Sequence, residues 1–286
     1  MVLVRRTPLL RYLLLAAMLA LLLLISSFWL PHGGGPDCGA AWPPCLSLYH
    51  TPRPPRVREA APVLKECPGQ RFQTWRLLLS LESSLSDDDD VLLEPYLQSW
   101  DQLLVFMESL GAVVRFFSQK VEEKILLMRQ LSLSHGAEAP WKPLSGAYRS
   151  VGSMVEAELG AGMVDFSRRS DSGCRTLLRL HRSLLWLKLM LEGLAEGPDA
   201  AGRFKTPGEL GRQAYQQALA PHHPWMLRRA AELLFVALPE RGFFLRLVCV
   251  EQQEAEPVLR VLVQALTRVH ARTQRILARR GLLELP

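Results

Sequence analysis

The distribution of apolar residues divides the chain into three parts. Residues 12–30 form an apolar run without a charged side chain, and residues 31–69 are rich in proline and glycine. From Phe72 onward, apolar positions recur at helical spacing, and no alternating run predicts a strand. We therefore predict a membrane or signal segment at 1–30, a linker at 31–69 and one all-α domain at 70–286.

The apolar run at 12–30 is long enough for a helix that crosses a bilayer. At 1.5 Å per residue it spans about 28 Å, close to the ~30 Å hydrocarbon core. Arg5, Arg6 and Arg11 precede it, which places the N-terminus in the cytosol and the domain in the lumen or outside the cell. The length of the run favours a signal anchor over a cleaved signal peptide that releases a secreted protein. A cytosolic domain is a further alternative.

Three cysteines lie in the linker. In a lumenal chain, a disulfide between Cys38 and Cys45 is plausible and leaves Cys67 unpaired. Zinc ligation is a weaker alternative, because no CxxC pair or paired histidine spacing is present. Cys174 and Cys249 lie in apolar helical segments and are expected to be inert core thiols.

Turn-forming residues separate about eight predicted helices. Ser84–Asp90 ends one helix and supplies the N-cap of another that begins near Val91. The helices show no repeat of fixed period, so they predict a single domain rather than a solenoid. Further breaks are predicted at 134–143, at 170–173 before a helix that starts near Cys174, at 193–211, at 221–224, at 239–242 and at 254–257.

Charge and motifs exclude several classes of function. The net charge is +6, but residues 1–67 hold most of the excess and the rest is nearly neutral, so nucleic acid is not an expected partner. The sequence lacks GxSxG, GxxxxGK[ST], HExxH and a Rossmann glycine run. We therefore expect neither an enzyme nor a cofactor or metal site.

Cations are concentrated on one apolar helix, predicted over Cys174–Glu192. On a helical projection, Arg179 lies about 40° and Arg182 about 20° from Arg175, and Trp186 falls in the same stripe. Desolvated guanidinium groups require partners. The stripe therefore predicts a phosphate or sulfate ligand, which arginine binds bidentately.

The polar residues of this helix allow an alternative partner for the arginines and include a second polar stripe. A buried ion-pair network with Asp165, Glu156 or Glu158 is the alternative to an anionic ligand. A second polar stripe is assigned to the ordinary solvated face. It consists of His181, Lys188 and Glu192.

Basic residues elsewhere give weaker signals. Lys120 and Lys124 are spaced as an i,i+4 pair, which by itself is typical of a solvated face paired with Glu122 or Glu123. His223 lies at a predicted helix start, where a histidine is more often a cap or a packed imidazole than a ligand.

Several motifs, in the same order, resemble the glycolipid transfer protein family and more closely its ceramide-1-phosphate transfer branch. They are LEPYLQSWDQLLVFMESLG, SGCRTLLRLHRSLLWLKLMLEGL, HPWMLRRA and the terminal LLELP. The resemblance covers about residues 72–286. It implies a two-layer helical sandwich with a hydrophobic tunnel for lipid chains and a surface cleft for the head group.

Matched motif by motif, the resemblance also implies roles for individual residues. Arg175 and Arg179 correspond to phosphate-binding arginines, His223 to the histidine that contacts the ceramide amide, and Lys124 to a basic head-group residue. Further candidates are Lys120, Arg182 and Trp186, the last shared with the glycolipid branch.

Lys120 is a departure from the pattern of the family. The family has an aspartate here, which accepts from the sphingoid amide or hydroxyl, whereas lysine has donors only. Two outcomes are open: Glu122 or Glu123 replaces that acceptor, or recognition of the amide is weakened. The added cation strengthens the preference for phosphate.

These observations lead to one expected function and one rival. We expect a monomeric domain that binds anionic sphingolipids, foremost ceramide 1-phosphate, and transfers them between membrane surfaces. Each buried CH₂ of the lipid contributes about 0.8 kcal/mol, so the chains supply affinity and the polar cluster supplies selection. The rival is a membrane-tethered interaction module that no longer carries lipid, and Lys120 favours it.

Overall fold

The computed structural model describes residues 67, 69–136, 146–168, 171–248 and 252–286. Within these residues the chain forms nine α-helices and three 3-10 turns without a named strand, so the predicted all-α domain is confirmed. The helices are α2 Thr74–Ser83, α3 Leu93–Ser109, α4 Ala112–Gly136, α5 Val151–Gly160, α6 Gly173–Ala195, α7 Pro207–Ala218, α8 Trp225–Ala237, α9 Arg241–Leu247 and α10 Gln252–Arg279, and the 3-10 turns are η1 Ala147–Arg149, η2 Ala220–His222 and η3 Leu282–Glu284.

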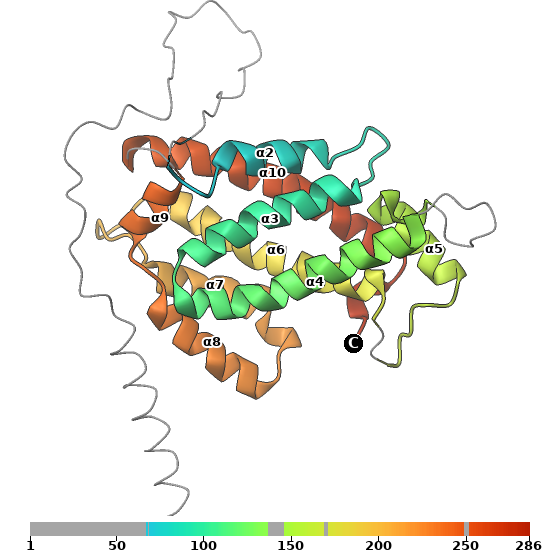
Figure 1. The fold of residues 1–286 in the computed structure, drawn as a ribbon. Coiled ribbons are helices and arrows are strands. Elements are labelled where there is room, and N and C mark those ends of the chain that lie inside the picture. The colour runs from blue at the N-terminus through green and yellow to red at the C-terminus, as the bar shows by residue number, and fades with distance from the viewer. Residues whose placement is uncertain (1–66, 68, 137–145, 169–170, 249–251) are drawn as a thin grey trace, which may run out of the picture. The chain divides into compact units, whose positions relative to one another are not determined.

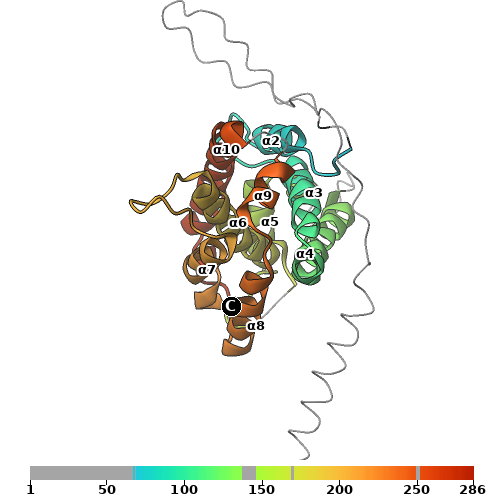
Figure 2. The ribbon, with the colours of Figure 1, turned by 90° about the vertical axis from the view of Figure 1, so that its left-hand side faces the viewer.

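The long helices pack in two layers (Figure 1). Figure 2 shows these layers along their edge, with α6, α7 and α10 in one and α2, α3 and α4 in the other. Helix α6 contacts α10 and α7 within its own layer and α4 across the sandwich. Helix α8 packs against α7 at the lower edge. The arrangement agrees with the sandwich that the sequence resemblance implies.

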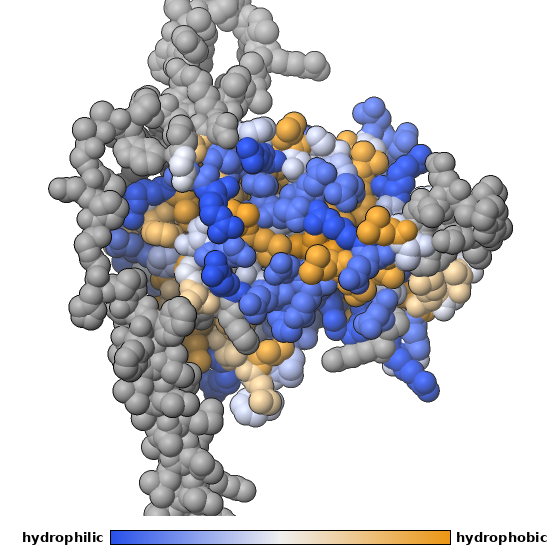
Figure 3. All heavy atoms as spheres, in the orientation of Figure 1, coloured by the Kyte–Doolittle hydropathy of each residue, from blue (hydrophilic) through white to orange (hydrophobic). Residues whose placement is uncertain are grey.

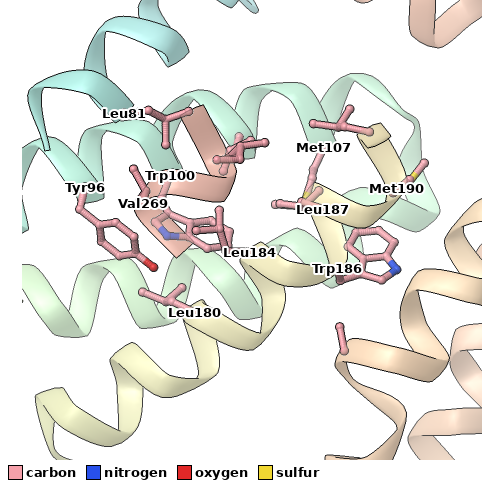
Figure 4. Close-up of a cluster of buried hydrophobic side chains, with 14 of the residues drawn as sticks. Leu81, Tyr96, Trp100, Met107, Leu180, Leu184, Trp186, Leu187, Met190 and Val269 are labelled. Atoms are coloured by element: carbon pink, nitrogen blue, oxygen red, sulfur yellow. The ribbon is translucent and has the colours of Figure 1, made fainter. Parts of the chain in front are cut away.

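The core lies between the layers and is built around α6. Leu180, Leu184 and Leu187 of α6 are buried, as are Tyr96 and Trp100 of α3. Figure 4 shows these side chains in one cluster. Burial of each large apolar side chain contributes about 1.5–3 kcal/mol, so the apolar periodicity of α6 fixes its place at the centre.

The aspartate run has a different role from the one predicted. Helix α3 begins after Leu92, which provides no side-chain cap. Asp90 instead accepts from the Gly152 amide (2.9 Å) and from the Ser150 hydroxyl (2.5 Å) at the start of α5. The prediction of an N-cap for the helix near Val91 is therefore wrong, because the loop turns Asp90 toward a helix that follows much later in sequence.

Two predicted breaks are corrected by packing. The connection between α6 and α7 covers only residues 196–206, because α6 continues through Gly193. A Cβ at Gly193 would lie 2.4 Å from Leu210, so this glycine allows α6 and α7 to approach rather than ending a helix. Pro257 lies inside α10, near its N-terminal end, where it removes a single backbone hydrogen bond.

The described cysteines give two outcomes. Cys67 is buried and forms a disulfide, so the expectation that it stays unpaired is wrong. Cys174 is a buried free thiol, as predicted. Cys38, Cys45 and Cys249 lie outside the described residues.

Among the described helices, none is both long and apolar enough to cross a bilayer. Residues 12–30, where the sequence predicts such a helix, lie outside the described part of the chain.

The second polar stripe of α6 is not an ordinary solvated face. His181 is only 2% exposed, and its ring stacks on His270 of α10 with 4.0 Å between the ring centroids. His181 Nε2 also hydrogen-bonds Gln274. Lys188 pairs with Glu192 at 3.1 Å in the next turns. The assignment fails for His181 because α10 covers this side of α6.

The histidine stack predicts loss of stability in acid. Burial lowers the pKa of His181 to about 4 and that of His270 to about 3. As the pH falls below about 6.5, these histidines therefore take up protons in the unfolded chain before they do so in the folded one. Each histidine then lowers the free energy of unfolding by at most about 1.4 kcal/mol per pH unit, until the pH reaches its pKa in the folded state. Denaturant unfolding at about pH 7 and pH 5 measures this loss. His270→Phe keeps the stacked ring and should reduce the pH dependence, whereas a pH dependence equal to that of the wild type contradicts the assignment.

Candidate functional site

The start of α6 is fixed by a buried carboxylate from α5. Glu158 is fully buried and accepts from the backbone amides of Gly173 (2.6 Å) and Cys174 (2.8 Å), while Tyr148 donates its hydroxyl to the same carboxylate. A negative charge at a helix N-terminus is favourable, because the unpaired amides there carry partial positive charge. Glu158 therefore fixes the origin of the helix that carries the predicted arginines.

The close approach of the Glu158 carboxylate to Gly173 makes this cap possible. A Cβ at Gly173 would lie 2.7 Å from Met154 Sδ and 2.9 Å from Glu158 Oε1, so a larger residue would displace the carboxylate. Ser172 completes the N-cap by accepting from the Arg175 amide at 3.2 Å. The local sequence thus sets the register of the arginine stripe relative to the rest of the fold.

The C-terminal turn holds two of the arginines. Arg175 is buried, and its Nε donates to a backbone oxygen of Pro286 at 2.6 Å. Arg182 is partly buried, and its Nη2 donates to the Leu283 carbonyl oxygen at 2.7 Å. These bonds fix the orientation of both guanidinium groups at one end of the sandwich.

Electrostatic effects show which other predicted residues share this site. Burial lowers the pKa of Lys124, and the adjacent charge of Arg179 lowers it further. Burial also lowers the pKa of His223, and the charges of Arg182 and Lys124 lower it further. Burial lowers the pKa of Arg182, and Arg179 adds to this effect. Side chains from α4, α6 and the turn before α8 therefore lie near enough to act on one another by charge.

Each cation also has a defined polar environment. Lys124 Nζ donates to the Lys120 carbonyl oxygen at 2.6 Å. His223 Nδ1 lies 2.9 Å from the Tyr215 hydroxyl, which orients the imidazole. Arg179 is exposed, so its guanidinium can be reached from solvent. The site is therefore open at Arg179 and ordered beneath it.

Two further candidates occupy different environments. Lys120 is exposed and pairs with Glu123 at 2.6 Å, and its charge contributes to the lowered pKa of Lys124. Trp186 is 7% exposed, and its indole N–H donates to the Gly211 carbonyl oxygen at 3.0 Å. Figure 4 shows Trp186 with the buried apolar side chains. The structure therefore assigns Trp186 a packing role between α6 and α7.

The carboxylates considered as arginine partners are engaged elsewhere. Glu156 pairs with Arg280 at 2.6 Å, and Asp165 accepts from the Ser167 amide and hydroxyl. Glu158 caps α6, as described above. Each of the three carboxylates therefore has a described partner other than the arginines of the stripe.

Sequence reasoning missed two residues near this site. His222 and Glu284 both lie close enough to Arg182 to exert charge effects: burial and Arg182 lower the pKa of His222, and Glu284 opposes this. Glu284 likewise opposes the lowered pKa of Arg182. The signal for Glu284 was the terminal LLELP motif, but only the fold shows that this turn meets α6.

A separate surface pocket of about 470 Å³ lies among α7, α8 and α9. Phe204, Phe235 and Arg241 are among the residues that line it, and the predicted head-group residues are not. Its arginines are engaged: Arg212 pairs with Glu232, and Arg241 donates to the Leu194 carbonyl oxygen. Chemistry therefore favours the cation cluster as the functional site.

Comparisons with known proteins identify the family. The chain matches the family described as Glycolipid transfer protein (GLTP) over residues 91–250. It is 39% identical over 222 residues to the ceramide-1-phosphate transfer protein of Xenopus laevis, covering 76% of this chain and 98% of that protein. It is 39% identical to the human ceramide-1-phosphate transfer protein, covering 75% and 97%.

Solved structures show the same relationship. Human ceramide-1-phosphate transfer protein in complex with 12:0 ceramide-1-phosphate matches with a TM-score of 0.66 at 38% identity, covering 73% of this chain and 97% of that one. The apo form of the mouse protein matches with a TM-score of 0.67 at 36% identity, covering 75% and 100%. The chain therefore belongs to the glycolipid transfer protein family. Within that family it belongs to the ceramide-1-phosphate transfer branch.

The cap on α6 predicts a large effect on stability. Glu158→Ala leaves two amides and a hydroxyl without their buried acceptor and should lower the free energy of unfolding by about 3 kcal/mol or more. Glu156→Ala, on the same helix, removes only a surface ion pair and should cost about 1 kcal/mol or less. Denaturant unfolding of the two variants measures the difference, and equal losses would contradict the capping role.

Proposed function

We propose that the protein binds ceramide 1-phosphate-like sphingolipids and transfers them between membranes. The observation that carries this proposal is that Lys124 of α4, Arg179 and Arg182 of α6, and His223 before α8 lie near enough to act on one another by charge. Guanidinium and ammonium groups form charge-assisted hydrogen bonds to phosphate oxygens. The similarity to the ceramide-1-phosphate transfer proteins of Xenopus laevis and human supports the same ligand class.

The two parts of such a lipid have separate roles in this account. The acyl and sphingoid chains supply affinity by leaving water, at about 0.8 kcal/mol per buried CH₂. The cation cluster selects the head group, because it compensates the charge of a phosphate and offers many donors. Transfer requires binding and release, so the protein needs no catalytic group.

Lys120 shapes what the site selects. Its ammonium is paired with Glu123, so this carboxylate is already engaged by a cation on its own helix. We propose that phosphate recognition dominates over recognition of the sphingoid amide. The rival function, an interaction module without bound lipid, is tested by the same transfer measurement.

Helix α8 provides a surface suited to a bilayer beside the site. Trp225 and Met226 are both 67% exposed and are separated from His223 by Pro224 alone. Arg228 and Arg229 are exposed next to them and complement anionic lipids. Figure 3 shows hydrophobic residues at the place of α8 in the lower part of the molecule. We propose that this end of α8 enters the membrane interface during lipid uptake.

Removal of one arginine tests the head-group site. Arg179→Leu removes a charge-assisted contact worth about 1.5–3 kcal/mol, so transfer of fluorescent ceramide 1-phosphate between vesicles should fall roughly tenfold or more. The matched control is Arg260→Leu, which removes an exposed i,i+4 pair with Glu256 on α10 and should leave transfer unchanged.

Whether Arg179→Leu still folds decides how a loss of lipid transfer is interpreted. Circular dichroism and the unfolding midpoint of Arg179→Leu should match those of the control. A folded variant with wild-type transfer contradicts the proposed site, and unfolding of the variant would make Arg179 structural instead.

We also propose that the domain lies in the lumen or outside the cell. Arg5, Arg6 and Arg11 before the apolar run at 12–30 support this orientation. The disulfide of Cys67 supports it independently, because disulfides persist in oxidising compartments and are rare in the cytosol. The predicted linker at 31–69 then tethers the domain if the segment is not cleaved.

Protease protection tests the orientation. With a C-terminal tag on the full chain, intact microsomes should protect the tag from protease. A full-length band that resists carbonate extraction supports a signal anchor, and a shorter soluble band supports cleavage and secretion. Digestion of the tag without detergent would place the domain in the cytosol and refute the proposal.

A further inference from the structure

Two polar groups of α3 lie inside the apolar core without a partner. Tyr96 and Trp100 are both 0% exposed, and neither the Tyr96 hydroxyl nor the Trp100 indole nitrogen has a hydrogen-bond partner among the described residues. Their rings pack edge to face with 6.5 Å between the centroids, but an indole N–H only donates, so Trp100 offers no acceptor for the Tyr96 O–H. A buried hydroxyl without an acceptor costs free energy that a phenylalanine in its place would avoid. The packing of the core therefore does not account for this hydroxyl.

The hydroxyl lies at the end of the sandwich where α6 begins. Just before α3, the Val91 carbonyl oxygen accepts from the Val151 amide at the start of α5 (2.8 Å), and α5 carries the cap of α6. Figure 4 shows the Tyr96 hydroxyl directed toward Leu180 of α6. Leu180 is 0% exposed, whereas Arg179, the residue before it, is exposed. A lipid with its phosphate at Arg179 and a chain between α3 and α6 therefore passes this hydroxyl directly behind its head group.

We propose that the Tyr96 hydroxyl donates to an oxygen on a lipid chain and selects ceramide 1-phosphates that carry a chain hydroxyl close behind the head group. The inference rests on the proposed function and adds the chemistry of the chain to that of the head group. The phosphate is not the acceptor, because it stays with the exposed guanidinium of Arg179 while Tyr96 lies in the core. A hydroxyl oxygen has two acceptor lone pairs, so it can accept from Trp100 as well. A plain hydrocarbon chain leaves both donors unpaired, and a site with buried donors disfavours such a ligand.

Three lipids of equal chain length test the selection. They are ceramide 1-phosphate, the same lipid with a hydroxyl on the acyl carbon next to the amide, and the same lipid with an additional hydroxyl on its sphingoid base. Competition between them for the full chain measures relative dissociation constants. The wild type should prefer one hydroxylated lipid over the plain one roughly tenfold, which corresponds to about 1.4 kcal/mol, and the preferred lipid shows which chain lies against α3. Tyr96→Phe removes only the hydroxyl and should bring this ratio close to one.

The stability of the lipid-free protein separates a ligand contact from a structural one. Tyr96→Phe breaks no hydrogen bond of the folded chain, so its thermal unfolding midpoint should equal or exceed that of the wild type. The matched control is Ser99→Ala on the same helix, because Ser99 is equally buried but donates its hydroxyl to the Tyr96 carbonyl oxygen at 2.6 Å. This control should lower the midpoint by roughly 2–4 °C and keep the wild-type lipid preference.

The outcomes distinguish this inference from the function beneath it. If the wild type binds none of the three lipids, the proposed function and the inference both fail. If it binds all three equally, or if Tyr96→Phe keeps the preference of the wild type, only the role of Tyr96 is refuted. A midpoint of Tyr96→Phe that falls as far as that of Ser99→Ala, or a variant that does not fold, would assign the hydroxyl to a hydrogen bond within the folded chain, such as one to a buried water, and would also refute the inference.

Discussion

The buried cap on α6 is the interaction on which the site depends. Glu158 binds the first amides of this helix, and Gly173 leaves the space that the carboxylate needs. Helix α6 is then covered by α4, α7 and α10, so its polar side chains have few directions in which to emerge. The arginines near its N-terminal end meet the terminal turn and α4 because the cap fixes where the helix begins.

The fold could be predicted from sequence to the level of its helices. Apolar periodicity identified an all-α domain, and the arginine spacing identified the stripe at residues 175–182. Local signals failed where distant segments meet. Asp90 caps α5 instead of α3, and Gly193 permits helix contact instead of ending a helix. A projection of one helix shows which residues share a face, but it does not show what covers that face.

The same limit explains why the candidate site could be predicted only in part. Arg175 and Arg182 were recognised as cations, but their backbone partners come from the end of the chain, about a hundred residues later. The projection placed Trp186 in the same stripe, whereas the fold buries it against α7. His181 was assigned to solvent because the sequence of its own helix does not indicate the stack with His270. Long-range packing therefore decided which members of each stripe became surface residues.

The site combines rigidity with an excess of positive charge. Backbone oxygens hold two guanidinium groups, and burial lowers the pKa of Lys124 and His223 at the same site. An anion that enters replaces mutual repulsion among these cations with attraction. This electrostatic arrangement, together with a large apolar core, suits a lipid that has a phosphate head and long chains.

The most direct test of this account is the identity of the lipid that the protein carries from cells. Native mass spectrometry of the purified full chain, followed by lipid extraction and fragmentation, measures the mass and head group of any bound molecule. The account predicts a phosphate-bearing sphingolipid in the folded protein, with ceramide 1-phosphate as the main species. A folded chain that is always empty, or that carries only lipids without a phosphate, would contradict it.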